Sequence, residues 1–341
     1  MQHKLIRNLA IIATLLTLVV VLLGAYTRLK DAGLGCPDWP GCYGFLSVPE
    51  SQEEISQAEA LYPHAPVETH KAWPEMVHRY FAGSLGLVIF ALALLAWRER
   101  YRNSRFPVVL PTVLLGLIVF QALLGMWTVT LNLFPLVVMG HLLGGFATLS
   151  LLFLLVLKLK PKMVSHSRVV ASKYKGLAFL ALVVLIVQIA LGGWTSSNYA
   201  ALICTDLPIC EPGWLSRLDF VEGFKPWGHG VDSYQYGVLD ANAMTAIHVS
   251  HRFGAIVSLL VIGLLVWRLI RERDSVILRA VGRVIGVILL LQLALGVSNV
   301  IFLLPLPIAV AHNGGAALLL LSLVAVNYLV NWQFRGKHID G

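Results

Sequence analysis

Four histidines stand where an ionisable side chain is least expected. They interrupt long apolar stretches of sequence, and an ionisable group in such a stretch is costly to bury and usually functional. They recur as two pairs, since a histidine followed by arginine and an aromatic residue appears twice, as does a histidine followed closely by two glycines. A lone histidine could simply bond a nearby carbonyl, but this recurrence favours a shared chemical function. The four are His78, His141, His251 and His312.

Each pair has the placement expected of two axial ligands of haem iron. His78 and His141 lie near the same end of two predicted helices, so their imidazoles can point inward from opposite sides at a similar depth, as can those of His251 and His312. A flat macrocycle between the helices would take one imidazole on each face. Zinc sites usually gather three or four ligands, and no Cys-x-x-Cys-His motif for covalent haem attachment is present. The pattern therefore favours two non-covalent haem sites.

The charged neighbours of the histidines differ between the two pairs. Arg79 and Arg252 each follow a histidine and could bind haem propionates, although an arginine snorkelling from a helix end would look the same. Glu75 lies three residues before His78 on the same helical face, whereas the equivalent position in the other half is His248. This asymmetry suggests one site for chemistry and one for electron transfer. The alternative is that Glu75 is a first-turn acid favoured by the helix dipole.

All four cysteines lie in two long loops and are spaced identically. Cys36 and Cys42 form one pair and Cys204 and Cys210 the other. Structural disulfides in an oxidising compartment are the first interpretation. A redox-active pair that exchanges electrons or thiols near the haem is the second, and the sequence leaves both open.

The elements that must position these residues are membrane helices. Hydrophobic residues make up 57% of the 341 residues and charged residues 13%, and the mean hydropathy is +0.77, far from the values of soluble domains. A helix needs about 20 apolar residues to cross a bilayer. We therefore predict an all-α polytopic membrane protein with eight transmembrane helices. The apolar runs are Asn8 to Tyr26, Glu75 to Trp97, Val108 to Val129, Leu136 to Leu157, Leu177 to Trp194, Ala243 to Trp267, Val284 to Leu304 and Pro307 to Val330.

An internal repeat arranges these helices in two halves. The loop cysteines, the His-Arg-aromatic triplets, a glutamine followed by glycine and the histidines before paired glycines all recur in the same order. We predict two tandem four-helix bundles in the same orientation, related by a pseudo-two-fold axis along the membrane normal. The expected divisions are an N-terminal bundle over residues 1–160, a linker over 161–175 and a C-terminal bundle over 176–341. The glycines beside His141 and His312 could admit a porphyrin or only close helix packing.

The basic residues define a topology. They cluster in short loops on one side, which places that side and both termini in the cytoplasm, with the long loops in the periplasm and the protein in the cell inner membrane. This explains the net charge of +8 better than nucleic-acid binding does. The first apolar run follows Lys4 and Arg7 but precedes no small-residue cleavage site, so we expect a retained anchor rather than a signal peptide.

Over nearly its whole length the sequence resembles the haem A synthases, the bacterial and mitochondrial enzymes that convert haem O into haem A for cytochrome oxidase. The four-histidine pattern in a duplicated frame carries the resemblance. Supporting matches are Thr27-Arg28-Leu29 with Gly33-Leu34, and the segment from Glu75 to Arg79. Members of the family differ over the outer cysteines, which some of them lack.

The resemblance implies a division of labour between the halves. His78, His141 and Glu75 would form the site for the substrate haem O, and His251 and His312 would ligate a resident haem b. One ring methyl would be oxidised to formyl by successive hydroxylations, with electrons leaving through the resident haem and Glu75 acting as base or stabilising a cation. The implied partners are membrane lipid, a haem O synthase (protohaem farnesyltransferase) and a membrane electron acceptor, and a homo-oligomer is left open.

Two other functions fit part of the pattern. A dihaem b-type electron-transfer subunit would explain the histidines, but neither the Glu75 asymmetry nor the paired cysteine loops. A transporter with proton-carrying histidines would bind no haem at all.

Overall fold

The computed structural model describes residues 2–104, 106–159, 173–227 and 229–331. In that part of the chain the regular elements are helices, and eight of them are long and apolar enough to cross a membrane. The predicted all-α, eight-helix membrane protein is thereby confirmed, while most of the expected linker 161–175 lies outside the described residues. The eight are α1 (Gln2–Leu29), α3 (Thr69–Arg102), α4 (Val109–Thr130), α5 (Pro135–Leu159), α7 (Lys175–Ser197), α9 (Ala241–Ile270), α10 (Val276–Ile301) and α11 (Leu306–Asn331).

Helix α3 begins earlier than its apolar run predicted. It starts at Thr69 and continues through Pro74, whose carbonyl accepts a hydrogen bond from the Thr27 hydroxyl of α1 at 3.1 Å. The first residues of α3 are mostly polar, so hydropathy alone could not include them. Glu75 therefore lies beyond the first turn, and the interpretation of Glu75 as a first-turn acid is wrong.

Helix α10 is displaced from its predicted range of 284–304. It begins at Val276 because the Ser275 hydroxyl accepts the backbone N–H of Leu278 as an N-cap. It ends at Ile301, just before Leu303 and Leu304, which have φ values of 55° and 61°. A left-handed backbone cannot continue a right-handed helix. Asn132 and Leu133 end α4 in the same way, so the repeat extends to its turns.

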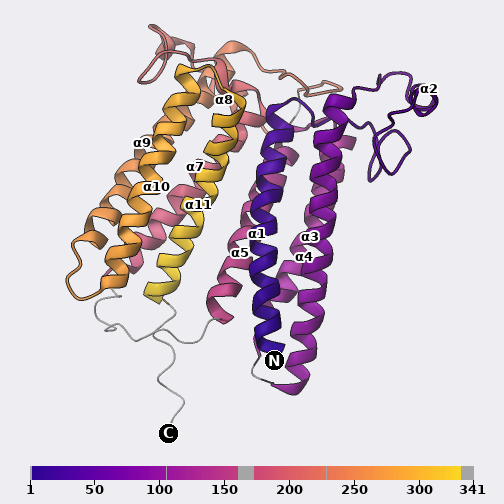
Figure 1. Ribbon diagram of the computed structural model, residues 1–341. Coiled ribbons are helices and arrows are strands. Elements are labelled where there is room, and N and C mark those ends of the chain that lie inside the picture. The colour runs from indigo at the N-terminus through magenta and orange to yellow at the C-terminus, as the bar shows by residue number, and fades with distance from the viewer. Residues whose placement is uncertain (1, 105, 160–172, 228, 332–341) are drawn as a thin grey trace.

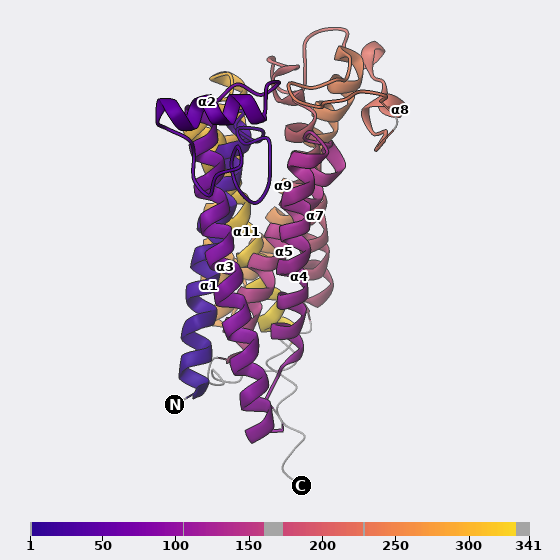
Figure 2. The ribbon, with the colours of Figure 1, turned by 90° about the vertical axis from the view of Figure 1, so that its right-hand side faces the viewer.

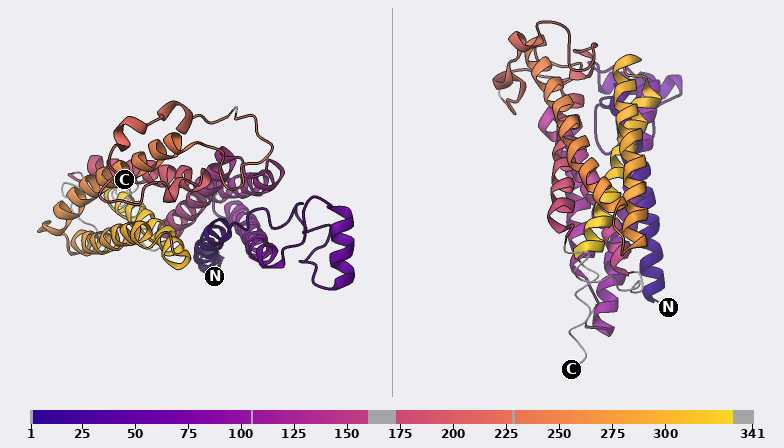
Figure 3. Two further views of the ribbon diagram at one scale, coloured as in Figure 1. Left: turned by 90° about the horizontal axis from the view of Figure 1, so that it is seen from above. Right: turned by 90° about the vertical axis from the view of Figure 1, so that its left-hand side faces the viewer.

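Each half places its two histidine-bearing helices at opposite corners. Helix α3 packs on α1 and α4, and α5 packs on the same two helices, so α3 and α5 face each other across the first bundle. In the second half α9 and α11 face each other between α7 and α10. Figure 3 shows both groups from above. The halves meet where α1 contacts α11, α7 contacts α5, and α5 contacts α11. These pairings fit the predicted pseudo-two-fold relation.

The apolar core fills the inner end of each bundle. One cluster joins α1, α3, α4 and α5, and a second joins α7, α9, α10 and α11 together with Phe146 and Leu149 of α5. The four histidines all lie beyond these clusters, toward the end that bears the long loops. Smaller apolar clusters around Met76 and around Trp194 pack the disulfide loops onto the outer ends of the bundles.

The long loops gather at one end of the molecule, with the start of α1 and the end of α11 at the other (Figure 1). The first loop carries the short helix α2 (Gln52–Leu61), which begins at the Ser51 capping box and projects to one side of the bundle (Figure 2). The second carries η1 (Ala200–Leu202), η2 (Trp214–Arg217) and α8 (Phe220–Gly223). Arg28 joins the halves, donating to the Ser196 carbonyl at 2.6 Å and lying over the Tyr199 ring at 3.9 Å.

Candidate functional site

His78 and His141 meet inside the first bundle as predicted. Their ring centroids are 6.3 Å apart and the ring planes are nearly perpendicular, at 86°. Both Nδ1 atoms are buried and have no hydrogen-bond partner. Glycines back both rings, since a Cβ on Gly24 of α1 would lie 3.0 Å from Cε1 of His78, and one on Gly125 of α4 3.5 Å from Cε1 of His141.

This geometry fits a metal centre held from two sides. Imidazole nitrogens bind a metal ion at about 2 Å, so two rings that share one metal have donor nitrogens about 4 Å apart and centroids somewhat farther. The 6.3 Å separation of the His78 and His141 rings is of that size. Two neutral nitrogen donors from opposite faces are also the donor set of a bis-histidine haem.

The second bundle repeats the arrangement with added amide groups. Gly192 of α7 lies against His251, and Gly296 of α10 against His312, at Cβ distances of 3.0 and 3.2 Å from Cε1. His251 and His312 are near enough to interact electrostatically. His251 also has an amide partner, Gln188 of α7, which lies 3.1 Å from its Nδ1.

Glutamines explain one glycine of each pair on α5 and α11. A Cβ on Gly144 would fall 1.7 Å from Nε2 of Gln121, and one on Gly315 would fall 2.1 Å from Oε1 of Gln292. Gln292 donates to the backbone carbonyl of His312 at 3.0 Å. These two glycines therefore make room for an amide beside each histidine of α5 and α11.

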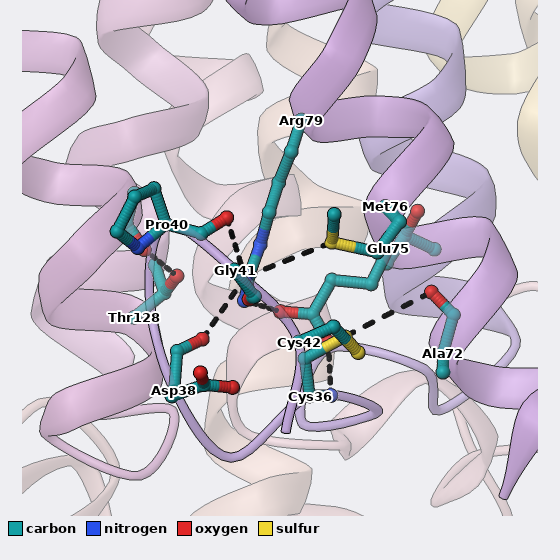
Figure 4. A network of polar contacts seen from close by, with 12 residues as sticks. Cys36, Asp38, Pro40, Gly41, Cys42, Ala72, Glu75, Met76, Arg79 and Thr128 are labelled. Atoms are coloured by element: carbon teal, nitrogen blue, oxygen red, sulfur yellow. Dashed lines mark hydrogen bonds and ion pairs between the residues drawn. A yellow bond between two sulfur atoms is a disulfide. The ribbon is translucent and has the colours of Figure 1, made fainter. Parts of the chain in front are cut away.

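Glu75 is buried in a network that ties α3 to the first disulfide loop. Its Oε1 pairs with Nη2 of Arg79 at 2.5 Å, and its Oε2 accepts the backbone N–H of Cys36 at 2.9 Å. The Arg79 guanidinium also donates to the carbonyls of Asp38, at 2.9 Å, and of Gly41. Figure 4 shows Arg79 reaching from α3 into this loop with Glu75 beside it. The carboxylate is thus held in place one turn from His78.

The second half keeps the arginine contacts but not the carboxylate. Arg252 donates to the carbonyls of Asp206 and Cys204, each at 2.6 Å, and of Ile209. Its Nε lies 3.0 Å from Nε2 of His248, and Nδ1 of that histidine lies 2.8 Å from the carbonyl of Ala200. The predicted asymmetry between Glu75 and His248 therefore lies in otherwise matching networks.

Both predicted cysteine pairs are disulfides, Cys36 with Cys42 and Cys204 with Cys210. Each closes the loop whose carbonyls receive an arginine. In the second loop Glu211 accepts the backbone N–H of Thr205 at 2.7 Å. Hydrogen bonds from the loop, that of the Thr205 N–H first among them, lower the pKa of Glu211 to about 2, so the carboxylate stays charged well below pH 4.5.

The structure brings together most residues that the sequence singled out. Each arginine lies beside its histidine but directs its guanidinium into a disulfide loop, and propionate binding by Arg79 and Arg252 stays a prediction. Sequence reasoning overlooked Gln188. The available signal was an amide inside an apolar run that has no counterpart in the first half.

Comparisons of the sequence with a family model and with known proteins indicate the same family. Residues 7–324 match the family described as cytochrome oxidase assembly protein. The chain is 50% identical over 319 residues to the haem A synthase of Shewanella oneidensis, with 94% of each chain covered. It is 28% identical over 345 residues to that of Caulobacter vibrioides, covering 95% of this chain and 94% of the relative. With the haem A synthase of Shouchella clausii it shares 26% over 309 residues and 88% of each chain.

Proposed function

Because the chain belongs to the family of cytochrome oxidase assembly proteins, we propose that it is a haem A synthase, a membrane oxidoreductase that oxidises a methyl group of haem O to formyl. One observation carries the proposal. Two imidazoles face each other across a bundle with centroids 6.3 Å apart, and a buried carboxylate is fixed one helical turn away. The first feature suits an iron porphyrin, and the second suits proton transfer at its edge.

The N-terminal bundle, residues 1–160, is proposed as the substrate half. His78 and His141 would hold the iron of haem O and so fix the position of the macrocycle. Glu75 would accept protons released as the methyl carbon is oxidised, or stabilise positive charge there. Arg79 and the N–H of Cys36 keep the carboxylate oriented, so it would need no rearrangement before reaction.

The C-terminal bundle, residues 176–341, is proposed as the cofactor half. His251 and His312 would ligate a haem b, which supplies one-electron steps for electrons leaving the substrate site. His248 and Arg252 occupy the places of Glu75 and Arg79 but bring no carboxylate. That half has no acid at the position where the first half would accept a proton, which suits electron transfer.

Surroundings and partners follow from the same proposal. We place the protein in the cell inner membrane, with both termini cytoplasmic and the disulfide loops periplasmic. A haem O synthase upstream and a membrane electron acceptor would complete the pathway of substrate and electrons.

Extraction and mass measurement of the haems decide the proposal. The purified protein from cells that make haem O should yield haem b together with haem O or haem A, and added haem O should be converted to haem A. Haem b alone, even with haem O supplied, would identify a dihaem electron-transfer subunit. A protein without a Soret band after haem-sufficient growth would overturn haem binding altogether.

A further inference from the structure

The side chain of Gln188 reaches from α7 to one of the histidines of the C-terminal bundle. Its Nε2 lies 3.0 Å from the backbone carbonyl of His251 and 3.1 Å from Nδ1 of the same residue. Its Oε1 is buried and has no partner. The amide nitrogen of Gln188 therefore contacts both the backbone carbonyl and the ring of His251, and the amide oxygen has no partner.

Two positions differ together between the halves of the repeat. With Gly192 aligned on Gly24, Gln188 aligns with Val20, and with His251 aligned on His78, Gly254 aligns with Phe81. A Cβ on Gly254 would fall 2.1 Å from Oε1 of Gln188. The amide of Gln188 fits only because residue 254 lacks a side chain.

The first half lacks such a partner. Val20 offers His78 a backbone hydrogen bond but no side-chain amide, and Nδ1 of His78 is buried without a partner. A side-chain amide beside the histidine that precedes the arginine is thus a feature of the second half alone.

The surroundings of Gln188 make its bond strong. An open groove of about 220 Å³ lies between α7 and α9 over the amide, and apart from Gln188 itself only valines and Gly254 line it. Hydrogen bonds in such apolar surroundings are electrostatically stronger than in water. The lining residues are Val183, Val184, Val187, Gln188, Gly254 and Val257.

We propose that Gln188 is a positioning residue that orients His251 and tunes it as a ligand of the haem in the C-terminal bundle. The proposal rests on the proposed function. Because Nδ1 faces the amide, Nε2 is the nitrogen left for iron, and Nδ1 then carries a proton. Turning the amide about its last side-chain bond exchanges Nε2 and Oε1, which presents Oε1 to that proton in place of the bond from Nε2 to the His251 carbonyl. An acceptor there makes the imidazole a more basic ligand. The haem held by His251 is therefore stabilised in its ferric form, which lowers its reduction potential relative to the haem held by His78.

Redox titration of the purified holoprotein, with absorbance recorded for both haems, tests this inference. Gln188→Met removes the hydrogen bonds at similar volume. The ferric-to-ferrous equilibrium of one haem should move about tenfold toward ferrous, which for one electron is about 59 mV. Gln188→Glu keeps an acceptor oxygen and should restore the wild-type potential or go below it. Ile186→Met, on the exposed side of α7, is the matched control and should change neither haem.

A second variant leaves the amide in the chain. Gly254→Ala places a Cβ where Oε1 now lies, so it should displace the amide and raise the potential as Gln188→Met does. If both variants leave both potentials at their wild-type values in a protein that holds two haems, the inference is wrong while the proposed function stands. A wild-type protein without haem would instead remove the proposed function.

Discussion

Glu75→Gln separates the chemistry from haem binding more sharply than any other substitution. The change removes the charge that pairs with Arg79 at 2.5 Å but keeps an oxygen for the N–H of Cys36. Removing one partner of a buried ion pair costs about 3–5 kcal/mol. Arg79 retains its bonds to the carbonyls of Asp38 and Gly41, so we expect the lower end of that range. The substitution touches neither imidazole, and His78 and His141 should still hold haem.

Turnover should respond far more strongly than binding. A positioned proton acceptor contributes about 10²–10⁴-fold to rate, so formyl formation should fall by that factor while the haem content stays near that of the wild type. The assay is mass measurement of haems extracted from the purified variant after incubation with haem O, with the Soret absorbance as the measure of bound haem.

Glu99→Gln provides the matched control. Glu99 is also a buried acid of α3, but it lies at the inner end of the helix, 3.4 Å from His3. This variant should lose some stability and keep its turnover. Unchanged formyl formation in Glu75→Gln would refute the assignment of Glu75. An equal loss of turnover in Glu75→Gln and Glu99→Gln would show that the effect is not specific to Glu75.

Three further outcomes are expected. Gly24→Val should displace His78, because even its Cβ would lie 3.0 Å from the ring, and lower the haem content to one per chain, measured as haem-to-protein ratio. Replacing Cys36 and Cys42 with Ser removes a disulfide that stabilises the folded protein by about 2 kcal/mol. The change should also free the Cys36 N–H that holds Glu75, so turnover and melting temperature should fall together. Glu211 has a pKa of about 2 instead of the ordinary value near 4.5. Its hydrogen bonds therefore stabilise the second disulfide loop fully above pH 4.5, and this stabilisation is lost as the pH falls toward 2. Pepsin should cut the loop faster as the pH falls across that interval.

Each of these outcomes has a control in the same chain. Gly83→Val introduces the same side chain on α3, where a Cβ meets nothing within 4 Å, and should keep both haems. Serines at Cys204 and Cys210 open the other loop, whose arginine has no carboxylate partner on its helix. Loss of turnover with an unchanged melting temperature in the Cys36 and Cys42 variant would indicate redox-active sulfur instead of a structural staple. Glu211→Gln should leave only the pH dependence of pepsin itself.

Repetition in the sequence made most of this site predictable. A single histidine in an apolar run is ambiguous, but two pairs at matching places in a duplicated frame predict a shared depth and partner. The structure shows the shared depth for His78 and His141, whose rings meet across the bundle, while the shared partner stays a prediction. The eight spans were predictable for a similar reason, since the bilayer selects length and apolarity.

Contacts set by loops were not predictable. The start of α3 at Thr69 depends on packing of a polar segment against α1 and the first loop, which hydropathy does not register. The direction of Arg79 likewise depends on carbonyls of a loop that the disulfide folds back onto α3. Such backbone acceptors leave no residue-type signature in the sequence, so an arginine that binds a loop and one that binds a propionate look alike.

The differences between the halves argue for a division of labour after duplication. The arginine, its loop carbonyls, the disulfide and the glycine behind the first histidine are kept in both bundles. Among the groups beside the histidines, the halves differ in Glu75 near His78 and Gln188 near His251. A carboxylate can take a proton but an amide cannot, whereas an amide can orient a ligand without adding charge. Under the proposed function, Glu75 beside His78 and Gln188 beside His251 are the groups that would make one haem site reactive and the other a conductor of electrons.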